Sequence, residues 1–186
     1  MLFRSVIVFA KRHEIAQTMA AHFRKKRIHK VYSAILSRHL PNNTEQEVPE
    51  AYISLPIGHD IKSEIRIKQS VNSQGKPSQT HFREIEKIGD FSLVEARPLT
   101  GRTHQIRVHA AHLGCAIVGD KLYGLQNDGF INWLNEGDAY LRAQNFPLHR
   151  QLLHALEIRF PHPVTSEETV IRAEDKNLLT ELNQHL

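Results

Sequence analysis

Residues 97–109 combine a turn signal with a cluster of cations and hydrogen-bond donors. Pro98 fixes one backbone dihedral, and the Thr-Gly pair that follows it favours a sharp reversal at the end of an extended segment. Thr103 can then cap a helix that ends before Gly114, a residue type common just past a helix end. The apolar residues between them recur at helical spacing: Ile106, Ala110 and Leu113.

A helix that starts at this turn presents unpaired N–H groups and the positive end of its dipole, which together attract phosphate. Charged and donor side chains surround that start: Arg102, His104, Gln105 and Arg107. The pattern predicts a binding site for a polyanion. A solvated basic helix face is the alternative, because charge patterning alone is a weak signal.

The stretch Arg97–His109 resembles the third motif of the RluA-type pseudouridine synthases, Pro-x-Thr-Gly-Arg-[Ser/Thr]-His-Gln-[Leu/Ile]-Arg-Val-His, and residues 113–124 continue the match. Residues 30–35 resemble the Lys-x-Tyr-x-Ala motif of that family. Residues 75–80 resemble its Gly-Lys-Pro-Ala-x-Thr stretch, and Leu153-His154-Ala155 with His162-Pro163 resembles its closing segment. The resemblance covers nearly the whole chain.

The resemblance implies an RNA pseudouridine synthase, an enzyme that isomerises uridine after the target nucleotide leaves its stack and enters a pocket. It implies that Arg107 pairs with a nucleophilic aspartate through a charge-assisted fork. It also implies that Tyr32 stacks on the target base and assists proton removal at its carbon. We therefore expect Tyr32 and Arg107, as catalytic residues, to lie together at one buried pocket. The chemistry requires no cofactor.

RNA affinity outside the pocket is expected to come from phosphate contacts. The candidate RNA-binding residues are Arg24, Lys25, Arg27, Lys30, Arg102, Thr103, His104 and Gln105. For the basic run at 24–27, which ends a predicted helix, the alternative is a simple complement to the helix dipole. Structured ribosomal or transfer RNA is the expected partner. We predict no protein partner and a monomer.

The family's nucleophile lies in a His-Arg-Leu-Asp-x-x-Thr-Ser-Gly motif, just ahead of an apolar strand that resembles Val6–Ala10. This alignment puts the aspartate before Met1, and the first aspartate of the chain is Asp60. We therefore expect residues 1–186 to form a single catalytic domain that is truncated at its N-terminus and inactive in this form. A non-catalytic RNA-binding relative of the same fold is the alternative hypothesis.

Histidine is the commonest metal ligand, so a histidine-dependent metal hydrolase is a third hypothesis. The spacings of His104, His109, His112 and His154 match no helix-borne zinc signature. We therefore predict no metal site, and we expect His109 and His154 to make hydrogen bonds inside the fold.

The composition of the 186-residue chain is compatible with an RNA partner, since its formal net charge is +4 and its pI is about 9.3. The single cysteine, Cys115, excludes an intrachain disulfide and is expected to be a small buried residue. No apolar run approaches the length of a membrane span, and no signal-peptide pattern opens the chain. We expect a cytoplasmic protein.

The elements that must position these residues alternate between short strands and a few helices. Helical spacing links Ile15, Met19 and Phe23, and residues 175–186 are predicted to form a closing helix. Strand patterns occur at Val6–Ala10 (buried on both faces), Val31–Leu36, Ala51–Ile57, Glu64–Lys68, Thr80–Ile88, Phe91–Ala96, Leu156–Phe160 and Thr169–Arg172. Residues 41–50 and 71–78 are predicted loops. The expected fold is α+β, pseudouridine synthase-like. It is a mainly antiparallel mixed sheet with helices on one side and an RNA-binding cleft across the other.

Overall fold

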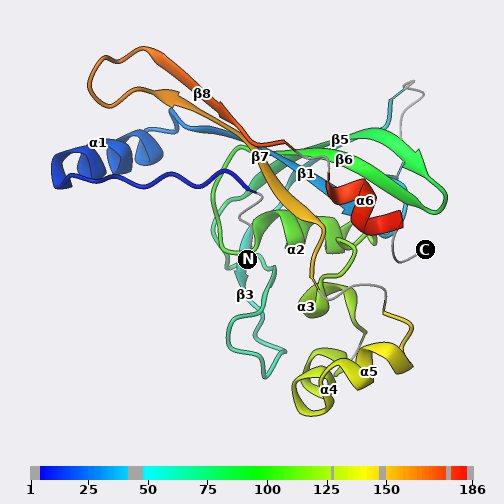
Figure 1. Ribbon diagram of the computed structural model, residues 1–186. Coiled ribbons are helices and arrows are strands. Elements are labelled where there is room, and N and C mark those ends of the chain that lie inside the picture. Colours follow the sequence, from blue (N-terminus) through cyan, green and yellow to red (C-terminus); the bar gives the residue numbers. More distant parts are fainter. Residues whose placement is uncertain (1–4, 42–47, 127, 147–149, 175–176, 184–186) are drawn as a thin grey trace.

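A six-stranded sheet forms the centre of the computed structural model, which describes residues 5–41, 48–126, 128–146, 150–174 and 177–183 (Figure 1). The strand order is β2-β5-β6-β1-β7-β8, and every neighbouring pair is antiparallel. The strands are β1 (His29–Leu36), β2 (Glu50–Ser54), β5 (Gln79–Ile88), β6 (Phe91–Pro98), β7 (Leu153–Pro161) and β8 (Glu168–Arg172). A separate hairpin pairs β3 (Ile57–His59) with β4 (Gln69–Val71). This arrangement confirms the α+β, mainly antiparallel prediction.

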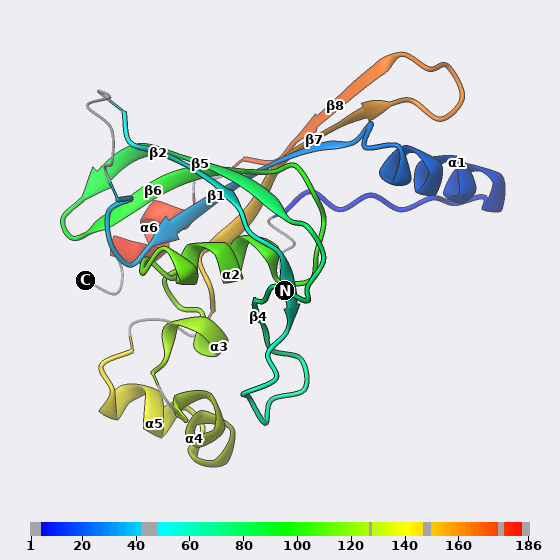
Figure 2. The ribbon, with the colours of Figure 1, turned by 180° about the vertical axis from the view of Figure 1, so that it is seen from behind.

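Two helices pack on opposite faces of the sheet, because side chains along a strand alternate between its faces. Ala34 and Leu36 of β1 pack in a cluster with Ile106 and Ala110 of helix α2 (Gln105–His112). The residue between them, Ile35, packs instead with leucines of helix α6 (Asn177–Asn183), namely Leu178 and Leu182. The expectation of helices on one side only is therefore wrong, and the sheet is covered on both faces (Figure 2).

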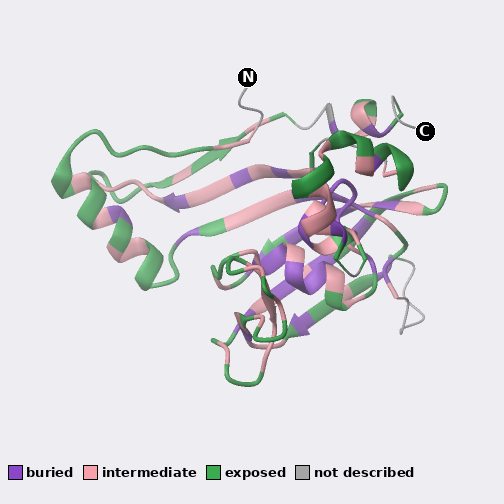
Figure 3. Ribbon diagram, turned by 90° about the horizontal axis from the view of Figure 1, so that it is seen from below, coloured by how far each residue is buried: buried purple, intermediate pink, exposed green. Residues whose placement is uncertain are grey.

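An arm extends from this body, formed by helix α1 (His13–Arg24) and the far part of the β7–β8 hairpin (Figure 1). Met19 of α1, Ile28 and Phe160 of β7 are buried together and join the two parts of the arm. Figure 3 shows that most of the remaining arm is exposed or half-buried. The predicted helical stripe of α1 is confirmed at Ile15 and Met19, whereas Phe23 is 52% exposed.

Two predicted strands are absent from the described part of the chain. Residues 6–10 are an irregular segment in which Phe9 is 83% exposed, and one hydrogen bond, from the Val6 N–H to the Ala155 carbonyl (3.0 Å), links them to β7. An apolar run becomes a buried strand only where neighbours cover it, and the described residues supply no such cover. Residues 64–68 form turns, because the Lys68 N–H donates to the Ile65 carbonyl.

The other strand predictions and the closing helix are confirmed within a few residues at each end. Residues 175–176 and 184–186 of that predicted helix, and 42–47 of a predicted loop, lie outside the described residues. Pro56 separates β2, an edge strand, from β3, as a proline at a strand end predicts. Three further helices were not predicted: α3 (Lys121–Gly124), α4 (Gly129–Glu136) and α5 (Asp138–Ala143).

Candidate active-site pocket

A pocket of about 170 Å³ opens beside β1, at the point where the chain turns from β6 into α2. Its lining comes from five segments, which are β1, the last residue of β6, the turn after it, the start of α2 and the first residue of β7. The lining residues are Lys30, Tyr32, Pro98, Thr100, Gly101, Arg102, His104, Gln105, Ile106, Arg107 and Leu153. The structure therefore brings the predicted motif at 97–109 against the predicted tyrosine strand.

Tyr32 and Arg107 line this same pocket, as the resemblance implied. Tyr32 is half-buried, and burial raises the pKa of its phenol, so the hydroxyl keeps its proton at neutral pH. Lys30 stands two residues earlier on the same face of β1, and burial lowers the pKa of its amine. A Cβ on Gly101 would lie 3.3 Å from Lys30 Nζ, so the amine reaches the turn across the pocket.

Arg107 is held in place by Asp120, whose carboxylate is fully buried. The guanidinium donates from Nε to Oδ2 (2.7 Å) and from Nη2 to Oδ1 (2.8 Å). Asp120 Oδ1 also accepts the backbone N–H groups of Leu122 (3.1 Å) and Tyr123 (3.2 Å), and so caps α3. This bidentate pair leaves Arg107 Nη1 unused by Asp120 and able to bind a second anion.

Tyr123 connects Arg107 to its surroundings. The guanidinium carbon lies 4.9 Å from the centroid of the Tyr123 ring, within cation–π range. The Tyr123 hydroxyl accepts the Gln69 N–H (3.0 Å) and lies 2.9 Å from His104 Nδ1. Burial, and then the charge of Arg107, lower the pKa of His104, whereas burial raises the pKa of Tyr123 to about 12. Both rings are therefore neutral at pH 7 and share one hydrogen bond between His104 Nδ1 and the Tyr123 hydroxyl.

Buried hydrogen bonds of Gln105 fix the turn itself. Its side-chain oxygen accepts from the Thr100 hydroxyl (2.7 Å) and the Arg102 N–H (3.0 Å). Its side-chain nitrogen donates to the Gln79 carbonyl (2.7 Å) and the Thr80 hydroxyl (2.9 Å). These four bonds use all the side-chain donors and acceptors of Gln105. Gln105 thus positions the turn, and its predicted contact with RNA stays a prediction.

His109 continues this network inside the fold, as expected. Its Nε2 lies 3.1 Å from the Leu55 carbonyl, so that nitrogen carries the proton, and Nδ1 accepts from the Thr80 hydroxyl at 2.8 Å. The same expectation is only partly met by His154. Its Nδ1 lies 3.5 Å from Ser5 Oγ, but its buried Nε2 has no partner among the described residues.

The predicted N-cap, Thr103, does not cap the helix. The cap position of α2 is His104, which adopts a left-handed conformation (φ 56°) and makes no side-chain cap hydrogen bond. At this turn the Gln105 side chain accepts the Arg102 N–H. Thr103 is exposed and does not line the pocket. The left-handed His104 instead turns its ring toward Tyr123.

The remaining RNA candidates divide between two places. Arg102 is exposed at the pocket, where its Nε donates to the Pro77 carbonyl (3.2 Å). Arg24, Lys25 and Arg27 lie at the end of α1 and beyond it, away from this pocket, and Arg27 lines a second one. Sequence reasoning missed Asp120 and Tyr123 as functional residues. Their signal was available, since both stand in the stretch 113–124 that continued the family match.

Among the described residues, no group of three or more His, Cys, Asp or Glu side chains is arranged to hold a metal ion. None of the helices in the described ranges is long and apolar enough to cross a membrane. Cys115 is buried, and burial raises the pKa of its thiol to about 11.

The fold is that of the RNA pseudouridylate synthases. The structure of human RNA Pseudouridylate Synthase Domain Containing 1 superposes with a TM-score of 0.68 and 29% identity, over 92% of this chain and 64% of that one. Human RNA Pseudouridylate Synthase Domain Containing 4 shares the fold, with a TM-score of 0.64 at 21% identity. The family model described as RNA pseudouridylate synthase matches residues 6–112, and the chain belongs to this family.

Curated relatives support the same family assignment. The ribosomal large subunit pseudouridine synthase C of Vibrio cholerae is 35% identical over 168 residues, which are 90% of this chain and 47% of that protein. The protein of the same name from Yersinia pestis is 35% identical over 174 residues, or 94% of this chain and 49% of the relative. An uncharacterized RNA pseudouridine synthase of Chloroflexus aurantiacus is 33% identical over 158 residues. The chain spans about half the length of these relatives.

Proposed function

We propose that this chain forms the substrate pocket of a pseudouridine synthase that acts on ribosomal RNA. The observation that carries the proposal is the shared pocket of Tyr32 and Arg107, with Asp120 fixing the arginine from behind. The preference for ribosomal over transfer RNA rests on the similarity to relatives named as ribosomal large subunit enzymes.

The pocket supplies three parts of the reaction. Tyr32 stacks on the everted uracil and assists proton removal at its carbon, and Arg107 Nη1 holds the nucleophilic carboxylate in its ionised form. Lys30 and Arg102 contact the phosphates that flank the target nucleotide. The chain contains no aspartate ahead of Asp60, so we assign to it the binding and positioning of the RNA. We expect turnover once a segment with the family's aspartate motif is joined ahead of Val6.

Two forms of the protein test this proposal: the 186-residue chain, and a version extended upstream through the aspartate motif. Conversion is measured as tritium release from 5-tritiated uridine in a ribosomal RNA fragment and in a transfer RNA. We expect the extended form to convert the ribosomal fragment and the shorter form to bind it without converting it. Binding without conversion by both forms favours the non-catalytic alternative. Absence of RNA binding by either form contradicts the proposal.

The roles of the two catalytic residues are tested in the extended form. Because a lysine ammonium cannot hold Asp120 through two parallel hydrogen bonds and also present a further nitrogen to the nucleophile, Arg107→Lys should lower kcat by about 10²-fold or more. Tyr32→Phe keeps the stacking ring and should lower kcat by a similar factor, about 10²-fold, through loss of the hydroxyl. RNA dissociation constants, measured by fluorescence anisotropy, should change by less than about threefold. Equal losses of binding and turnover would contradict these roles.

A further inference from the structure

A second pocket, which we call the arm pocket, lies where the end of α1 meets the β7–β8 hairpin. Its volume is about 320 Å³, and four of its lining residues can carry positive charge: Lys26, Arg27, His29 and Arg159. Ser166 and Glu168, from the far part of the hairpin, complete the polar lining. None of these residues lines the first pocket.

The fold itself gathers these cations from two distant segments. Ile28 is buried against Met19 and Phe160, while the residues on either side of it, Arg27 and His29, remain exposed. In the sheet register His29 stands directly opposite Arg159, so their side chains project on the same face, with Cβ atoms about 5 Å apart.

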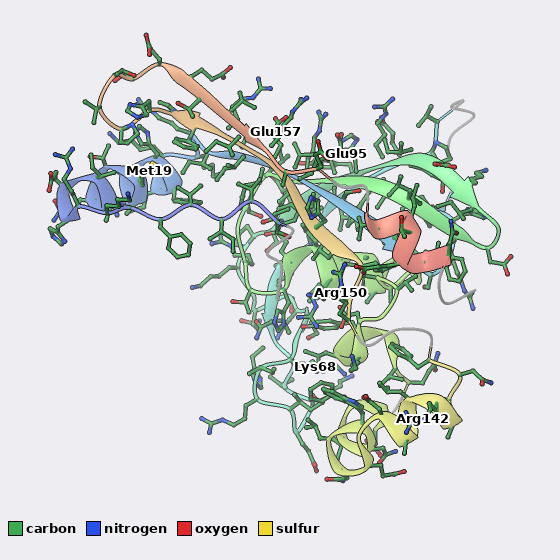
Figure 4. All side chains as sticks on the ribbon, viewed as in Figure 1. Met19, Lys68, Glu95, Arg142, Arg150 and Glu157 are labelled. Atoms are coloured by element: carbon green, nitrogen blue, oxygen red, sulfur yellow. The ribbon has the colours of Figure 1, made fainter. Side chains whose placement is uncertain are left out.

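The charge balance of the arm pocket is positive. Arg159 is shared between two carboxylates, with Nη2 3.5 Å from Glu157 Oε1 and Nη1 3.6 Å from Glu168 Oε2. Glu157, which is labelled in Figure 4, is also bound by Arg172, so its charge is already matched outside the pocket. Within the described part of the chain, Lys26 and Arg27 have no carboxylate within ion-pair distance. An anion in this pocket would therefore meet two unmatched cations.

Two residues that line the arm pocket have a left-handed backbone conformation, because the chain turns there. Four non-glycine residues of the described chain have positive φ, and two of them, Lys26 (φ 54°) and Ser166 (φ 63°), line this pocket. A third, His104 (φ 56°), lines the first pocket. Lys26 follows the last turn of α1, where its N–H donates to the Phe23 carbonyl, and Ser166 lies in the β7–β8 turn, where its N–H donates to the His162 carbonyl.

We propose that the arm pocket binds a backbone phosphate of the substrate RNA, outside the target nucleotide. This inference rests on the proposed function and adds a second anchor to it. The two pockets follow one strand, since His29 lines the arm pocket while Lys30 and Tyr32 line the first. From His29 to Tyr32 the chain advances about 10 Å. His29 lies on the opposite face of β1 from Lys30 and Tyr32, so an RNA that places its target nucleotide in the first pocket wraps around the arm to set a nearby phosphate in the arm pocket.

The test compares two double variants that each remove two exposed cations. Lys26→Ala with Arg27→Ala empties the arm pocket of its unmatched charge. Lys62→Ala with Arg66→Ala is the matched control, because both residues are exposed and lie outside both pockets. RNA binding by the 186-residue chain is measured by fluorescence anisotropy as a function of salt concentration.

For the arm variant we expect RNA binding about tenfold weaker at low salt. The slope of log affinity against log salt concentration should also be smaller by about one to two, because each lost phosphate contact lowers it by about 0.7–0.9. The control should change RNA affinity by less than about twofold, because salt screens charges that lie far from the bound RNA. Glu168→Gln should tighten binding by about twofold to threefold, because it releases Arg159 and removes a repulsive carboxylate. A purely structural role of the pocket predicts no such gain.

Three results would overturn the inference. One is an equal loss in the arm variant and the control, which would indicate net charge alone. Another is that the unaltered chain binds inorganic phosphate and the arm variant does not, while both bind RNA equally well. The arm pocket would then be a site for free phosphate. The third is absence of RNA binding by the unaltered chain, and this alone also overturns the proposed function.

Discussion

At the residue scale, Arg107 is fixed from two sides before any substrate arrives. Asp120 holds two of its nitrogens, and the Tyr123 ring lies under its guanidinium. Groups that are already oriented do not have to be reorganised during the reaction, which is how enzymes stabilise developing charge. The Tyr123 hydroxyl also accepts the N–H of Gln69 in β4, so the β3–β4 hairpin is tied to the same arginine.

Replacing Asp120 by Asn tests this anchor. Asn keeps the size and the capping oxygen for α3 but places an NH₂ group against the Arg107 donors. We expect the free energy of unfolding to fall by about 2–3 kcal/mol, because a nearly buried cation loses its partner. In the extended enzyme kcat should fall more than KM changes, as expected of a positioning residue.

Asp128→Asn is the matched control for this substitution. Asp128 is exposed at the cap position of α4, and its side chain makes no cap hydrogen bond. Its replacement should change stability by less than about 0.5 kcal/mol in urea unfolding. A similar small effect for Asp120→Asn would show that Asp120 does not hold the arginine in solution.

At the scale of elements, α2 and α6 have different tasks on the two faces of β1. The α2 helix carries the pocket arginine and packs on the face of Ala34 and Leu36. The α6 helix closes the opposite face over Ile35. Because β1 is the strand that carries Lys30 and Tyr32, packing on both of its faces fixes the floor of the pocket.

The packing of α6 is tested by Leu182→Ala. Leu182 is fully buried, so its truncation should lower the free energy of unfolding by about 2–4 kcal/mol. The control is Leu134→Ala in α4, where Leu134 is 59% exposed and the expected loss is below about 0.5 kcal/mol. Both losses in the free energy of unfolding are measured by urea unfolding, with the m-value unchanged between the variants. Comparable losses for the two variants would contradict the packing role of α6.

At the scale of the whole molecule, stability should depend on pH in two windows. Burial lowers the pKa of His109 and of His104, so the unfolded chain binds more protons than the folded one as pH falls through the ordinary histidine value of 6.5. Stability is therefore lost on acidification below about pH 6.5. The hydrogen bond from Arg172 lowers the pKa of Glu157 below its ordinary 4.5, and this contribution is lost as pH falls through the lowered value.

Thermal unfolding between pH 8 and pH 3 measures both windows. His109→Gln should lower the melting temperature at pH 8 and flatten its dependence on pH near 6, because the buried titrating group is gone. His13→Gln, on the exposed start of α1, should leave the curve unchanged. Glu157→Gln should lower stability above pH 5 and flatten the curve below it. Parallel curves for all variants would contradict this account.

The sequence by itself determined the family, most of the strands, the turn that carries Arg102 and the helix that carries Arg107. These are local features, because strand alternation, a proline-led turn and a continuous motif are all written in consecutive residues. The resemblance also placed Tyr32 and Arg107 at one pocket, and the structure confirms that they share it.

Only the tertiary structure decided which groups complete each site. Asp120 meets Arg107 because α3 returns to α2, and Arg159 meets His29 because of the register between β1 and β7. The same reason explains why the predicted strand at residues 6–10 is wrong and why the partners of Gln105 were not predicted. Burial of an apolar run and the partners of a buried amide depend on residues far away in the chain, and no local pattern specifies them.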